Sequence, residues 1–110
     1  MIIAVDFDGT IVEHRFPSIG KPIPNAIKVL KELQKRGHQL ILWTYRDGAY
    51  LREAVEYCKS QGIEFWAVNE SSPEEEFNPR YNSRKIYADI YIDDRNVGGL
   101  IEWDIIGKLI

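Results

Sequence analysis

Two acidic residues that directly follow an apolar run have the clearest chemical potential in this chain. Asp6 and Asp8 come after Ile2-Ile3-Ala4-Val5 and precede Gly9. Residues two apart on a strand point the same way, so both carboxylates are expected to face one small volume. Like charges at that distance repel unless a cation or a proton lies between them. The pair predicts a metal site, an acid/base pair or both, and the alternative is an exposed Asp-x-Asp-Gly turn.

The composition predicts one small globular domain over residues 1–110. Of the 110 residues, 45% are hydrophobic and 28% are charged, and no apolar run approaches the roughly 20 residues of a membrane span. The opening Met-Ile-Ile lacks the basic segment of a signal peptide. Cys58 is the only cysteine, which excludes an intramolecular disulfide, and we expect it on a helix core face. We therefore expect a reducing cytoplasm and no membrane partner.

The net charge of -3 disfavours a surface that tracks nucleic acid. The basic residues are nevertheless concentrated in predicted loops, which hold seven of the 14. If these loops converge, they would give an acidic protein a cationic mouth for an anionic substrate. The seven are Arg15, Lys21, Arg46, Arg80, Arg84, Lys85 and Arg95.

Predicted strands and helices alternate along the chain. Such alternation predicts an α/β domain with a parallel sheet, right-handed crossovers and helices on both faces. Residues 69–84 resist assignment. The strands are expected at 2–5, 38–43, 63–68 and 88–92; the helices are expected at about 24–36, from an Asp47 cap to Gly62, and at 102–110.

Polar and acidic residues follow all four predicted strands. In open parallel sheets ligands bind beyond the carboxyl ends of the strands, so residues distant in sequence are expected to meet there. This convergence favours a functional site over a simple turn at the first acids. The residues are Asp6 and Asp8, Thr44 and Arg46, Asn69, and Asp93 with Asp94, in strand order.

Four of these features, in this order, resemble the motifs of the haloacid dehalogenase-like (HAD) superfamily. They are the run Asp6-Phe7-Asp8-Gly9-Thr10, Thr44 after the second strand, Lys85 before the fourth, and Asp93-Asp94 after it. The second Asp resembles the phosphatase and phosphotransferase branches. The resemblance implies a three-layer Rossmann-like domain of strand order 3-2-1-4 without a cap domain. It implies a Mg²⁺-dependent hydrolase of phosphate monoesters.

The chemistry of the residues fits that reaction. Asp6 is suited to in-line attack on phosphorus, which gives an aspartyl-phosphate, and Asp8 to protonating the leaving oxygen and then deprotonating water. Mg²⁺ prefers oxygen ligands. We expect these from Asp6 and one of Asp93 or Asp94, with Asp93 preferred because adjacent strand residues point apart. The resemblance adds the backbone carbonyl of Asp8.

Further residues are expected to contact the substrate or its phosphate. Thr44 can donate a hydrogen bond to a phosphoryl oxygen, and Lys85 can neutralise its charge. Arg46 is a candidate phosphate contact, with a surface ion pair to Asp47 as the alternative. The full set of predicted substrate contacts is Phe7, Gly9, Thr10, Arg15, Arg46 and Asn69.

Two segments are candidates to cover the site. Residues 11–23 have room for a short flap, and residues 69–84 form either a lid or a flexible acidic surface loop. An open site of this kind admits large substrates or is closed by a second subunit. We expect a small anionic phosphorylated substrate, such as a sugar phosphate or nucleotide. The alternatives are a phosphatase for a nucleic-acid 3′-phosphate, which the lack of a basic stripe disfavours, and a noncatalytic phosphate-binding module.

Overall fold

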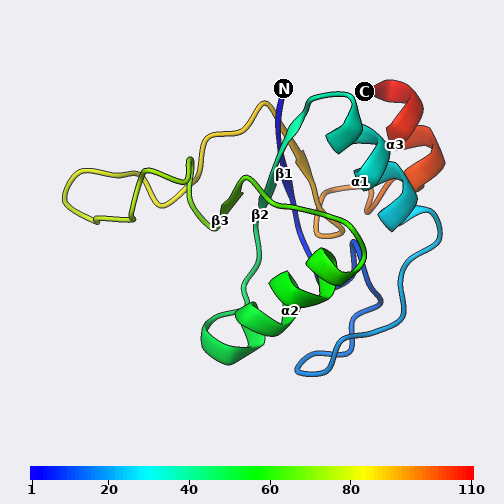
Figure 1. The fold of residues 1–110 in the computed structure, drawn as a ribbon, viewed down its shortest axis with the longest axis horizontal. Helices are drawn as coiled ribbons and strands as arrows, with labels where there is room; N and C mark the ends of the chain where they lie inside the picture. The colour runs from blue at the N-terminus through cyan, green and yellow to red at the C-terminus, as the bar shows by residue number, and fades with distance from the viewer.

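The computed structural model describes all 110 residues as an α/β fold in which strands and helices alternate, as the sequence predicts. The elements are β1 (Ile2–Val5), α1 (Ala26–Lys35), β2 (Gln39–Leu42), α2 (Gly48–Ser60), β3 (Ala67–Val68), β4 (Ile90–Ile92) and α3 (Trp103–Leu109). Figure 1 shows the strands at the centre, with α1 and α3 to their right, α2 below them and a long irregular arm on the left. No helix has the length and apolar character to cross a bilayer.

The four strands form one parallel sheet in the order β3-β2-β1-β4. This confirms the predicted order 3-2-1-4. In the register of the sheet Ile3 lies beside Leu40 on β2 and Ile90 on β4. Because all strands run the same way, the residues that follow β1, β2 and β4 emerge at one edge of the sheet.

The helices all lie on one face of the sheet, whereas we expected helices on both. Ile3 and Val5 of β1 belong to a core of 17 buried residues that includes side chains from α1, α2 and α3. Ala4 and Ile41 face the other way into a core of four, to which no helix contributes. The connection from β3 to β4 forms no helix, so this second face is covered by residues of that connection, such as Ile86.

The two longer helices begin and end near the residues that the sequence indicates. Helix α1 buries Ala26, Val29, Leu30 and Leu33, one stripe at helical spacing. After both helices a glycine N–H bonds to a carbonyl of the last turn, from Gly37 to Gln34 and from Gly62 to Lys59. The residues after these glycines bond to Leu33 and Cys58, which completes the hydrogen-bond pattern that closes many helices. Asp47 is the N-cap of α2, and its carboxylate accepts from Gly48 N at 2.8 Å.

Strands β3 and β4 are shorter than the expected ranges 63–68 and 88–92. Ile63 is buried in the helix-side core, and Glu64 N donates to the side chain of Gln34 at 2.7 Å. A side-chain contact to α1 therefore replaces strand pairing at Glu64, and backbone pairing with β2 begins at Trp66, whose N–H donates to the carbonyl of Leu40 at 2.7 Å. The segment between the two strands contains no helix or strand and projects sideways as the yellow-green arm in Figure 1.

Candidate active site

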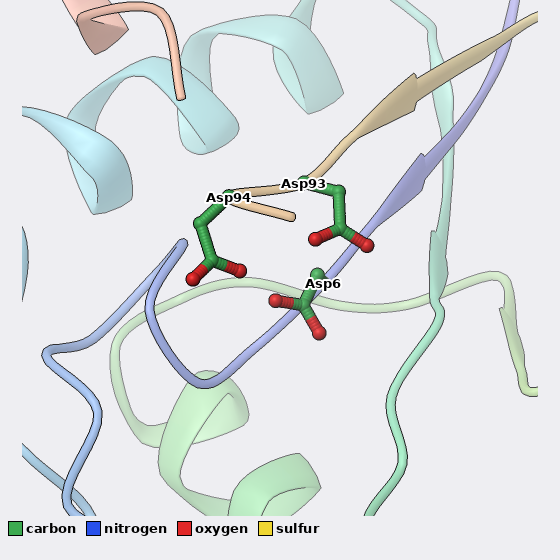
Figure 2. A group of neighbouring side chains, drawn as sticks. All are labelled: Asp6, Asp93 and Asp94. Atoms are coloured by element: carbon green, nitrogen blue, oxygen red, sulfur yellow. The ribbon is translucent and has the colours of Figure 1, made fainter. Parts of the chain in front are cut away.

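Three carboxylates meet beyond the carboxyl ends of β1 and β4. One oxygen of each of Asp6, Asp93 and Asp94 lies within 4.8 Å of the others, and Figure 2 shows both Asp93 and Asp94 turned toward Asp6. We expected the two neighbouring acids to point apart. They converge because β4 ends at Ile92 and the chain turns at once, with Arg95 N donating to Asp93 Oδ1 at 2.8 Å.

Burial and the neighbouring acids of this cluster disfavour the charged form of Asp6. Burial, and after it the charge of Asp93, raises the pKa of Asp6 from 3.8 to about 7. Arg95 lies 4.0 Å from Asp94, but its side chain is 80% exposed and neutralises little. Three acids around one point are therefore suited to binding a positive charge.

Thr10 links the carboxylates to each other and to the core. Its hydroxyl lies 2.9 Å from Asp6 Oδ2 and 3.3 Å from Asp94 Oδ1, and it accepts from Asp94 N at 3.0 Å. The carbonyl of Thr10 accepts a buried 2.8 Å hydrogen bond from the indole of Trp103 in α3. Thr10 itself is fully buried. Thr10 therefore positions the acids. We expected its side chain to contact the substrate, but the side chain is buried and does not reach the cleft surface.

Phe7 and Gly9 also have structural roles. The Phe7 ring is fully buried in the helix-side core. Gly9 has a φ of +84°, and a Cβ there would lie 2.3 Å from Asp94 Oδ2. Only glycine allows both this conformation and the close approach of Asp94. The predicted substrate contacts at Phe7 and Gly9 are therefore not made by side chains.

Asp8 is paired with Arg46, outside the carboxylate cluster. Arg46 Nε and a terminal nitrogen donate to the two oxygens of Asp8, each at 2.8 Å. The same guanidinium donates to the carbonyls of Pro17, Ser18 and Tyr50 at 2.9 to 3.3 Å. A guanidinium has five N–H donors, and these bonds use all of them. Arg46 therefore has no donor left for a substrate phosphate, contrary to our expectation, and the Asp8 side chain is not in the metal cluster.

Residues 11–23 form the predicted flap, which Arg46 attaches to the domain. Backbone bonds pair Glu13 with Lys21 and Ile11 with Ile23. The Arg46 side chain is 1% exposed, and its guanidinium lies 5.2 Å from the centre of the Phe16 ring. The flap is thus held at both its backbone and its aromatic side chain.

Thr44 lies at the cleft, and Asn69 holds it there. Asn69 Oδ1 accepts from Thr44 N at 2.8 Å, and the Thr44 hydroxyl accepts from Arg46 N at 3.1 Å. The hydroxyl hydrogen of Thr44 remains available to a ligand. Asn69 does not line the cleft, so its role is to position Thr44 and it is not the expected substrate contact.

These residues surround a cleft of about 640 Å³. The sequence predicted that six of the residues after the strands would lie together, and all six line the cleft: Asp6, Asp8, Thr44, Arg46, Asp93 and Asp94. That prediction missed the contribution of Trp43 and Tyr45, whose positions beside Thr44 could have indicated it. The other lining residues are His14, Phe16 and Arg95.

The expected cationic mouth does not form, because the loop cations are dispersed. Arg15 pairs with Glu13 at 3.6 Å on the outside of the flap. Lys85 adjoins Ile86, which packs on the sheet face away from the helices. The Lys85 ammonium lies 5.2 Å from the centre of the Tyr91 ring, and it lines no part of the cleft. The predicted catalytic role of Lys85 is therefore not supported by its position. Residues 69–84 line no part of the cleft, so they do not act as a lid in this conformation.

A solved structure from a bacterium is similar over almost the whole chain. It is described as the structure of a conserved protein coded by a locus of Bacteroides thetaiotaomicron, with 55% sequence identity and a TM-score of 0.92. The similarity covers 99% of this chain and 88% of that chain. The chain belongs to the same family as this Bacteroides protein. Its description names no activity. No family model and no curated protein match the chain.

Proposed function

We propose that this chain is a Mg²⁺-dependent phosphatase of the HAD type that hydrolyses a phosphate monoester through an aspartyl-phosphate on Asp6. The observation that carries the proposal is the convergence of Asp6, Asp93 and Asp94 within 4.8 Å. Thr44 lies in the same cleft. The sequence resemblance adds the reaction class, because its first, second and fourth motifs are the segments that meet here.

The ligand chemistry fits Mg²⁺. The cluster offers carboxylate oxygens and no sulfur or imidazole donor, which is the donor type that Mg²⁺ prefers. Bound there, Mg²⁺ would neutralise the acids and the substrate phosphate, so that Asp6 could approach phosphorus. The carbonyl of Asp8 stays a predicted further ligand.

In the proposed reaction, Asp6 supplies the nucleophile. A bond forms between an Asp6 carboxylate oxygen and phosphorus while the bond from phosphorus to the ester oxygen breaks. Asp8 gives a proton to that leaving oxygen. In the second step Asp8 takes a proton from water as the water oxygen attacks phosphorus and releases Asp6. Thr44 is suited to donating a hydrogen bond to a phosphoryl oxygen throughout.

The ion pair between Asp8 and Arg46 affects the two steps differently. Both oxygens of Asp8 accept charge-assisted hydrogen bonds from Arg46. This arrangement suits the second step, in which Asp8 is a base. For the first step, one of these bonds must open so that an Asp8 oxygen can hold a proton.

The test is hydrolysis of p-nitrophenyl phosphate with Mg²⁺, with EDTA, and by Asp6→Asn. We expect EDTA and the substitution each to abolish turnover, because one removes the proposed cation and the other the nucleophile. Asp104→Asn is the matched control, since Asp104 is an exposed acid of α3. Unchanged turnover in Asp6→Asn would refute the nucleophile, and the absence of any turnover in the wild type would refute the phosphatase.

The single thiol offers no competing nucleophile. Cys58 is fully buried in α2, as expected from its spacing, and burial raises its pKa to about 12. A thiol that stays protonated at neutral pH is inert. A lone buried cysteine agrees with a reducing compartment, and we propose the cytoplasm as the site of action.

A further inference from the structure

The cleft has a second component that the chemistry of phosphate transfer does not require. Three of its lining residues are aromatic: Phe16 from the flap, and Trp43 and Tyr45 from the segment after β2. We call these three residues the aromatic rim. They lie in the same cleft as Asp6 and Thr44, so a substrate with its phosphate at Asp6 would extend along them.

Tyr45 is the most informative member of the aromatic rim. Its side chain is fully exposed, so the ring contributes nothing to the packing of the fold. Its backbone, however, is fixed on both sides, by the bond from Thr44 N to Asn69 and the bond from Arg46 N to Thr44. A fully exposed ring on a fixed backbone at the cleft leaves its aromatic faces open to stack on a ligand.

Phe16 is presented in the same way from the flap. Its ring is 47% exposed, although one side packs edge-on against Tyr50 and the Arg46 guanidinium lies 5.2 Å from its centre. These contacts hold the ring at the cleft and leave part of its surface open to a ligand.

The polar side chains of the cleft are poorly matched to a sugar. Thr44 is the only aliphatic hydroxyl among the eleven lining residues, which include no Ser, Asn or Gln. A site that selects a sugar by its hydroxyls needs several such partners. The acids are committed either to the cluster around Asp6 or to Arg46, whose own donors are all used within the protein. Apart from Thr44 and the aromatic rim, this leaves His14 and Arg95 as the other polar side chains of the cleft.

We infer that the substrate is a mononucleotide, whose phosphate lies at the Asp6 cluster and whose base stacks on the aromatic rim. This inference rests on the proposed phosphatase function and selects the nucleotide over the sugar phosphate. Stacking of a base on an aromatic side chain tolerates different bases, so the rim selects for a base and not for one particular base.

The experiment compares adenosine 5′-monophosphate with ribose 5-phosphate, in which a hydroxyl at C1 takes the place of the base. We expect kcat/KM to be at least about fivefold higher for the nucleotide, as the loss of one stacking partner costs roughly 5- to 150-fold. Tyr45→Ala should bring this ratio toward one, mainly through KM, whereas Tyr45→Phe keeps the ring and should keep the ratio. Tyr81→Ala removes an exposed ring outside the cleft and is the matched control.

The outcomes separate this inference from the phosphatase proposal. If p-nitrophenyl phosphate is hydrolysed in an Asp6-dependent reaction while the two substrates have equal kcat/KM, the inference is wrong and the phosphatase stands. If no substrate is hydrolysed, the phosphatase proposal fails, and the mononucleotide inference falls with it. A higher kcat/KM for an oligonucleotide with a 3′-terminal phosphate than for any mononucleotide would overturn the mononucleotide assignment.

Discussion

On one side of the cleft, Asp6, Asp93 and Asp94 surround a point with no buried cation, whereas on the other side Asp8 shares both its oxygens with the buried Arg46. We call these the carboxylate side and the arginine side. Asp6 and Asp8 are two residues apart, yet Asp8 is paired with an arginine of the protein whereas Asp6 lies beside two further acids. The difference teaches that paired acids in a sequence need not share a partner, and that the proposed metal would serve only the carboxylate side.

The arginine side should respond to mutation with the largest loss of stability. Arg46→Gln removes the five donors and leaves Asp8, whose side chain is 13% exposed, without its counter-charge. Breaking a buried pair in this way typically costs about 3–5 kcal/mol, and it also releases the carbonyls of Pro17 and Ser18 in the flap. Urea unfolding measures the loss.

Two further variants separate the charge of Arg46 from its geometry. Arg46→Lys retains the charge but cannot make the two-pronged pair, so it should restore only part of the stability. Arg95→Gln removes the other arginine of the cleft, which is 80% exposed, and should change stability by less than about 1 kcal/mol. Equal effects for Arg46→Gln and Arg95→Gln would remove the distinction between the two sides.

On the carboxylate side, a substitution should raise the stability instead of lowering it, because removing an acid there relieves repulsion. The pKa of Asp6 is raised from 3.8 to about 7 in the folded protein, so the folded state retains a proton that the unfolded state loses. The stability from this proton is complete below about pH 4 and is lost as the pH rises through about 7. In EDTA, Asp6→Asn should therefore unfold at a higher temperature than the wild type at pH 8, with no difference at pH 4.

The pH dependence of Mg²⁺ binding is a second test of the raised pKa of Asp6. Mg²⁺ competes with the proton on Asp6, so its apparent affinity should fall roughly tenfold per pH unit below about 7. Asp93→Asn removes the second largest cause of the raised pKa and should flatten this dependence. Titration of Mg²⁺ by calorimetry between pH 5.5 and 8.5 measures it. An affinity independent of pH would contradict the account of Asp6.

The sequence was sufficient to predict the features that depend on local pattern. Strand ends follow from apolar runs, so it placed Asp6, Thr44 and Asp93 at one sheet edge. The partners of Arg46 could not be predicted in this way, because they include carbonyls of Pro17 and Ser18 whose positions depend on the path of the flap. The convergence of both Asp93 and Asp94 depends likewise on where β4 ends, and a strand boundary is the least predictable feature of an element.

The motif order also gave one wrong placement, and its cause lies in the connection from β3 to β4. Lys85 matches the order of a known motif, but it adjoins Ile86, which packs on the sheet face away from the helices, and it lines no part of the cleft. An arm that forms no helix cannot be assumed to return across the sheet. A motif therefore predicts a role only when the path of the connecting segment brings its residue to the site.

Lys85→Gln should accordingly have the smallest effect of these substitutions. Its ammonium lies over the Tyr91 ring and lines no part of the cleft, so we expect kcat/KM for p-nitrophenyl phosphate to stay within about twofold of the wild type. Arg84→Gln, whose guanidinium lies over the Phe77 ring of the same arm, is the matched control. A loss of a hundredfold or more in Lys85→Gln alone would mean that the arm folds across the carboxyl edge during turnover, which would give the carboxylate side a protein cation after all.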